Sequence, residues 1–161
     1  MNEPATFRAA VRAVAFGDGP TARRIHDELD EAAHERLFGF AIAVMSICIE
    51  HRFAGNADHD AFREFANEMR EDFRDSDPPL KPLAVEVVLR GFAGEEHLLD
   101  EIPVMDQMNL RYPLIRKIVA DSPALQAEFD DVLDQAERML ERWADDEEDD
   151  VDRPEEPWAP R

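Results

Sequence analysis

Four residues between positions 20 and 34 have the types and spacing that could bind a metal ion. His26, Asp30 and His34 are four residues apart, and Glu31 stands three residues before His34. On one continuous helix this spacing places the side chains on one side, where imidazole and carboxylate ligands could share a cation. A ferritin-like di-metal centre needs a second Glu-x-x-His pair, and the chain contains none. The favoured interpretation is a solvated polar face, and a helical metal-binding enzyme is the alternative.

Other patterns for catalysis are weaker. Glu50 and His51 are neighbours in sequence, so on a helix they point in different directions and do not form a ready acid–base pair. The chain has no Gly-x-Ser-x-Gly nucleophile elbow, no phosphate-binding Gly-x-x-x-x-Gly-Lys loop and no Cys-x-x-Cys pair. Its one cysteine, Cys48, lies in an apolar run, which predicts a buried structural thiol and a reducing compartment. We therefore expect a protein that is not an enzyme and needs no cofactor.

The strongest hydrophobic signal is the run Leu37–Ile49, LFGFAIAVMSICI, with Gly39 inside it. Thirteen residues of helix span roughly 20 Å, which is short of the roughly 30 Å hydrocarbon core of a membrane. Because the run is apolar on nearly every face, it predicts a central helix with neighbours all around it. We expect Gly39 to allow one of these neighbours to approach closely.

The remaining segments predict an all-α fold. Apolar residues recur at helical spacing within each segment, and capping residues, glycines and prolines separate the segments. The predicted helices cover residues 5–16, 20–33, 58–75 and 78–92, short helices cut by Pro103 and Pro113, and a last long helix from Pro123 to Trp143. Residues 1–143 should thus form a single-domain bundle of six to seven helices around the apolar helix 37–49. Whether helices 20–33 and 34–53 are continuous stays open.

The net charge of the chain limits its possible functions more than any motif does. Thirty-eight acids against eighteen bases give a net charge of −20, and only Lys81 and Lys117 among the bases are lysines. A chain of this charge repels phosphate surfaces, which argues against direct binding of DNA, RNA or an anionic membrane. The natural partner is a basic protein. No signal-peptide pattern opens the chain, because residues 1–16 form an amphipathic pattern with Arg8 and Arg12 on its polar side, so we expect a cytoplasmic protein.

The last eighteen residues lose the helical period. They hold nine acids and two arginines, a net charge of −7, which leaves −13 on residues 1–143. Like charges and three prolines predict a flexible acidic tail at 144–161. Trp158 is either an anchor for a partner or a loose terminal residue.

Charge patterning within the helices suggests where a partner binds. In the last helix, Asp130 and Asp134 precede Arg138 and Arg142, an order that supports an isolated helix. Helix 58–75 instead stacks like charges four residues apart, which does not favour folding. The predicted partner-binding residues are Glu64, Glu68, Glu71, Asp72, Asp75, Asp145, Asp146, Glu147, Glu148 and Trp158. If the structure placed the Glu64, Glu68 and Asp72 row inward against arginines of the same chain, the argument for an external basic partner would fail.

Three functions remain as hypotheses. The first is an acidic binding module that docks onto a basic protein, of the immunity, antitoxin, chaperone or nucleic-acid-mimic type. The second is the metal-binding enzyme. The third is a structural or regulatory homo-oligomer that associates through Met105, Met108 and Tyr112.

Overall fold

A computed structural model describes residues 2–77 and 79–151. In this part of the chain the only regular structure is helical, which confirms the predicted all-α bundle. The helices are α1 (Glu3–Ala15), α2 (Gly19–Glu28), α3 (Glu31–Arg52), α4 (His59–Asp72), α5 (Pro82–Phe92), η1 (a 3-10 helix, Glu96–Glu101), α6 (Val104–Ala120), α7 (Pro123–Ala127) and α8 (Phe129–Val151). Residues 84–89, whose β-branched side chains would also suit a strand, lie within α5.

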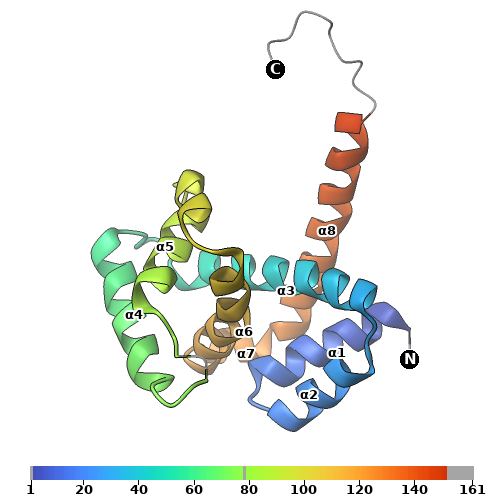
Figure 1. Ribbon diagram of the computed structural model, residues 1–161, viewed down its shortest axis with the longest axis horizontal. Helices are drawn as coiled ribbons and strands as arrows, with labels where there is room; N and C mark the ends of the chain where they lie inside the picture. The colour runs from blue at the N-terminus through green and yellow to red at the C-terminus, as the bar shows by residue number, and fades with distance from the viewer. Residues whose placement is uncertain (1, 78, 152–161) are drawn as a thin grey trace, which may run out of the picture.

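The apolar run forms the middle of α3, the central helix of the bundle. Helices α6 and α8 pack on α3, α4 packs on α5, and α1 packs on α2 and α6 (Figure 1). At 22 residues, α3 is longer than the apolar run, and its length and composition would also suit a membrane span. The length argument from the sequence therefore does not distinguish the two roles. Burial supports the core role, because half of the most apolar window of α3 is buried inside the protein.

Short polar side chains begin several of the helices. Each of these side chains accepts a hydrogen bond from a backbone N–H in the first turn that follows. The residues are Asn2, Asp18, Asp30, Asp58 and Ser122. These bonds satisfy donors that would otherwise lack a partner inside the helix. Helix α1 ends at Ala15, one residue before the predicted end, and Gly17 follows with a φ of 79°, a left-handed conformation that favours glycine.

A break separates α2 from α3, so the predicted helices 20–33 and 34–53 are not continuous. Helix α2 ends at Glu28, Leu29 is extended, and Asp30 begins α3 by accepting a hydrogen bond of 2.8 Å from the N–H of Ala33. Asp30 is a capping residue, and capping requires a non-helical backbone. The predicted helix 20–33 is therefore wrong at its end, and His26 and His34 belong to different helices.

Proline marks fewer boundaries than the sequence predicts. Pro113 lies inside α6, which runs unbroken from Val104 to Ala120, so the predicted cut there is wrong. A proline inside a helix removes one backbone hydrogen bond, but Leu110 before it and Leu114, Ile115 and Ile118 after it are buried in the core, and this packing outweighs the loss. Helix α5 begins at Pro82 after Lys81 rather than after Asp77.

The last long helix differs from the prediction at both ends. Ser122 caps the short α7, and a turn at Glu128 separates α7 from α8. At the other end, α8 continues to Val151, eight residues into the segment predicted to be a flexible tail. This final part of α8 stands clear of the rest of the bundle (Figure 1). Residues 152–161 lie outside the described part of the chain.

Candidate functional site

The predicted metal-binding row does not assemble. Because of the break at Leu29–Asp30, the side chain of Asp30 is used as a cap and Glu31 lies in the exposed first turn of α3. His34 Nε2 donates a hydrogen bond of 2.9 Å to the carbonyl of His26. Among the residues that the structure describes, no three His, Cys, Asp or Glu side chains are grouped so that they could hold a metal ion.

His26 has a structural partner that the sequence did not indicate. Its Nε2 is joined to the hydroxyl of Tyr112, on α6, by a hydrogen bond of 2.8 Å. The His34 ring lies 5.4 Å from the His26 ring, and the guanidinium of Arg111 lies 4.4 Å from the centre of the Tyr112 ring. Burial lowers the pKa of His26, and the nearby His34 and Arg111 lower it further. The cluster therefore favours a neutral His26 that ties α2 to α6.

The acidic face of α4 is partly neutralised from within the molecule. Lys117, on α6, places its Nζ 3.4 Å from Glu68, 2.8 Å from Asp72 and 2.9 Å from Asp121. Its side chain is only 10% exposed. Partial burial alone would lower the pKa of Lys117, but hydrogen bonds to Asp72 and Asp121 outweigh it and raise that pKa. Two members of the predicted partner-binding row thus have an internal role.

The other acids of this face stay open to solvent. Glu64 is exposed and makes no ion pair within residues 2–77 and 79–151. Arg74 lies 3.5 Å from Glu71 and 3.9 Å from Asp75, and all three side chains are exposed. Helix α4 ends at Asp72, so Asp75 lies beyond it and does not continue a helical row. The row is thus shorter than predicted, and contacts between such exposed groups contribute little to stability.

The second predicted acidic group lies on the protruding end of α8. Asp145, Asp146, Glu147 and Glu148 are all exposed there, and they form no ion pair with any residue in the described part of the chain. Trp143, just before them, is 40% exposed. Trp158 lies outside the described residues.

The first half of α8 uses its acids differently from the prediction. Asp130 and Asp134 do not pair with arginines of their own helix. Asp134 pairs with Arg8 and Asp130 with Arg12, both on α1, at 2.8 and 2.7 Å. The predicted polar side of α1 is therefore an ion-paired contact with α8.

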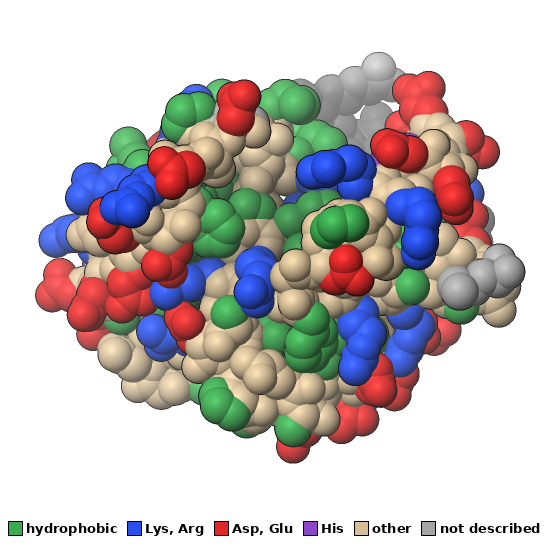
Figure 2. All heavy atoms as spheres, turned by 90° about the horizontal axis from the view of Figure 1, so that it is seen from below, with side chains coloured by type: hydrophobic (Ala, Val, Ile, Leu, Met, Phe, Trp, Pro, Cys, Tyr) green, Lys and Arg blue, Asp and Glu red, His purple; other side chains and the backbone are tan. Residues whose placement is uncertain are grey.

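Seen from below, the surface mixes both signs of charge. Figure 2 shows basic side chains beside acidic ones over much of this face, with acidic side chains gathered at its left edge, the side on which Figure 1 places α4. No charged residue among those described is buried. The ion pairs of this protein are therefore surface features, and the excess of acids faces solvent.

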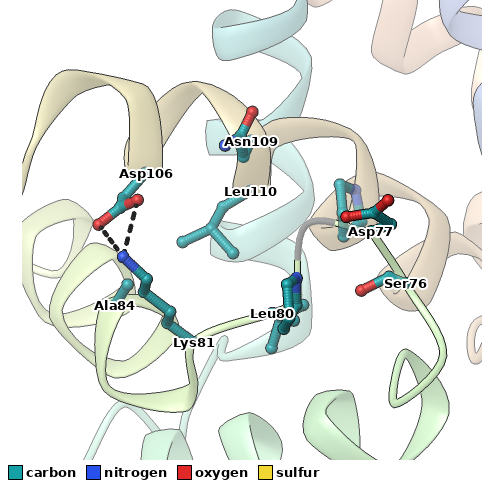
Figure 3. Close-up of a pocket in the computed structure, with 10 residues that line it drawn as sticks. Ser76, Asp77, Leu80, Lys81, Ala84, Asp106, Asn109 and Leu110 are labelled. Atoms are coloured by element: carbon teal, nitrogen blue, oxygen red, sulfur yellow. Dashed lines mark hydrogen bonds and ion pairs between the residues drawn. The ribbon is translucent and has the colours of Figure 1, made fainter.

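A pocket of about 360 Å³ lies between the loop before α5, the start of α5 and α6 (Figure 3). Lys81 Nζ lies 3.1 Å from Asp106 Oδ2 at one side, so these two charges neutralise each other. Leu80, Leu110 and Pro113 supply much of the remaining wall. The pocket can hold a small apolar group beside the Lys81–Asp106 pair, and Asp77 is a further carboxylate in its lining.

Cys48 is buried, as predicted. Burial raises the pKa of its thiol to about 12, so very little thiolate is present at neutral pH. Because the thiolate is the nucleophile, the position of Cys48 suits core packing rather than catalysis.

The three residues proposed for self-association differ in their exposure to solvent and in their contacts. Met105 is 62% exposed and lies next to the exposed Val104. Met108 is partly buried, and Tyr112 is held by His26. Of these three residues, only Met105, in the first turn of α6, is exposed.

Comparison with known proteins finds no matching family model, no similar curated protein and no similar solved structure. The class is therefore defined by fold and surface: an acidic, single-bundle all-α protein whose last helix extends beyond the core.

Proposed function

We propose that the protein is an acidic helical binding module that docks onto a basic partner protein, as an immunity protein, antitoxin, chaperone or nucleic-acid mimic does. One observation carries this proposal: no charged residue among those whose burial is described is buried, so their excess of acids over bases faces solvent. A surface of one dominant sign accelerates the encounter with a partner of opposite sign and aligns the complex.

The exposed acids are candidates for the contact. On and after α4 these are Glu64, Glu71 and Asp75, and on α8 they are Asp145, Asp146, Glu147 and Glu148. Glu68 and Asp72 contribute less, because Lys117 already neutralises much of their charge. The protruding end of α8 is the better supported of the two surfaces.

The experiment is affinity capture from the cells that make the protein. The immobilised chain is exposed to lysate at 50 mM and at 500 mM salt, beside a variant in which Asp145, Asp146, Glu147 and Glu148 are changed to amides. We expect a basic protein to be retained at low salt, released at high salt and weakly held by the variant. Recovery of no basic partner, or capture that ignores salt, would contradict the proposal.

A homo-oligomer is the second candidate, favoured by the exposed apolar side chains of Leu83, Val104 and Met105. Sedimentation equilibrium decides it. A monomer mass at all concentrations would remove this candidate and leave the binding module unaffected. The metal-binding enzyme has no comparable geometric support within residues 2–77 and 79–151.

A further inference from the structure

One face of α8 carries acids along nearly its whole length. The residues of this acidic row are Asp130, Asp134, Glu137, Glu141, Asp145 and Glu148. Neighbouring members are three or four residues apart, so they lie on the same side of the helix. The row begins inside the bundle and continues into the part of α8 that stands clear of it (Figure 1).

The first half of the row already binds a helix. Arg8 Nη1 lies 2.8 Å from Asp134 Oδ1 and 3.2 Å from Glu137 Oε1, and Arg12 Nη1 lies 2.7 Å from Asp130 Oδ1. Arg8 and Arg12 are four residues apart and therefore project from one side of α1. The protein thus contains its own example of how a helix with two arginines one turn apart fits this row.

The second half of the row has the same spacing and no cation. Glu141, Asp145 and Glu148 are exposed and make no ion pair with the described residues, and neither Arg138 nor Arg142 pairs with them. Acids three or four residues apart repel each other, and acids near the C-terminal end of a helix oppose its dipole. Cations placed on this face would relieve both effects.

Resting on the proposed function, we propose that Glu141, Asp145 and Glu148 form a docking face for a helix of the basic partner that carries two arginines or lysines four residues apart. The contact extends the α1–α8 interface along the same row. Charge complementarity selects the cations, and the spacing of the row selects a partner helix whose cations share one face.

Two synthetic helical peptides of identical composition test the partner. One has arginines at positions i and i+4, and the other has them at i and i+2, on different faces. Binding to the full chain is measured by isothermal titration at 50 mM salt, and amide chemical shifts map the contact. We expect the first peptide to bind at least tenfold more tightly and to shift amides of residues 141–148.

Two variants of equal charge change test the face. The row variant is Glu141→Gln, Asp145→Asn and Glu148→Gln, and the control is Glu28→Gln, Glu35→Gln and Asp131→Asn, exposed acids outside the row and outside the proposed contact. The row variant should lose at least tenfold in affinity for the first peptide, and the control less than threefold. If both variants lose equally, or the two peptides bind equally, the docking face is wrong and the acidic module stands. If neither peptide binds at low salt, both proposals are overturned.

Discussion

Lys117 is the most enclosed cation of the ion pairs described, and it holds three carboxylates together. Replacing it with methionine in Lys117→Met keeps an apolar stem but leaves Glu68, Asp72 and Asp121 to repel one another. Hydrogen bonds to charged groups stabilise by roughly 1.5–3 kcal/mol, and the half-exposed carboxylates reduce this through solvent screening. We expect a loss of about 2 kcal/mol in the free energy of unfolding, measured with urea.

The matched control is Lys81→Met, because the Lys81 side chain is 66% exposed and, within residues 2–77 and 79–151, pairs with one acid, Asp106, which is 20% exposed. A pair whose cation is open to solvent contributes about 0–1 kcal/mol. If both variants lose the same free energy of unfolding, the enclosure of Lys117 by three acids adds no stability.

His26 makes stability depend on pH. Its pKa in the folded protein is lowered by burial and by its neighbours, so the unfolded chain binds the proton more readily. The free energy of unfolding should therefore fall as the pH drops below about 6.5, the ordinary value for histidine. The carboxylate of Asp27 acts in the opposite direction and raises the pKa of His26.

The measurement is urea unfolding at pH 7.5 and pH 5.5. His26→Gln should lose less stability between these values than the unchanged chain, since glutamine does not titrate. His97→Gln removes an exposed histidine and serves as the control. If the free energy of unfolding changes with pH by the same amount in all three proteins, the assignment to His26 is wrong.

At the scale of the elements, the glycine that allows a close approach lies in α5 and not in α3, where the sequence predicts it. The sequence suggests a close approach at Gly39, but a Cβ atom there would meet only Leu140 Cδ2, at 3.9 Å, an ordinary contact. The close approach is at Gly91 in α5, where a Cβ atom would lie 2.6 Å from both Cγ and Cδ2 of Leu99 on η1. Spacing in the sequence identifies the glycines, but only the packing of distant elements determines which one is needed.

Two substitutions test this difference. Gly39→Ala should raise the free energy of unfolding by about 0.5–1 kcal/mol, because alanine restricts the unfolded chain and favours a helix. Gly91→Ala should instead lower it by about 1–3 kcal/mol, because Leu99 must move. Urea unfolding of both proteins gives the sign of each change, and a shared sign would refute the assignment.

Elements dominated by local interactions were predictable from sequence. Asp58 as a cap and the apolar core of α3 are signalled by adjacent residues, and the structure has both. The break at Asp30 and the continuity through Pro113 were not, because local preference allows either outcome and contacts with other helices decide. Helix α8 extends to Val151 although its last turns are acidic, and the sequence favoured the opposite.

For the whole molecule, the sign of the surface charge was predictable from the sequence, but the residues that form ion pairs with each other were only partly predictable. Composition alone gives the net charge of −20, whereas the link from Lys117 to Glu68 joins helices 49 residues apart in sequence. The i, i+4 pair of Lys117 and Asp121 was the one local signal for this cluster. Likewise, nothing near Arg8 indicates that Asp134 is its partner.

At the scale of the molecule, self-repulsion and local ion pairs respond oppositely to salt. Added salt screens the repulsion among surplus acids, which stabilises the fold, and it also weakens pairs such as Arg12–Asp130, which destabilises it. Exposed pairs are individually weak, and the surplus of acids is large. Repulsion should therefore dominate, and raising NaCl from 20 to 300 mM should raise the thermal midpoint by roughly 3 °C, equivalent to about 1 kcal/mol.

The Lys117→Met variant sharpens this test. It removes one cation and exposes three acids to one another, so its thermal midpoint should rise with salt by more than that of the unchanged chain. Scanning calorimetry of both proteins across the salt series measures the two slopes. A midpoint that falls with salt would mean that ion pairs outweigh repulsion, and the surface would then be internally balanced rather than open to a basic partner.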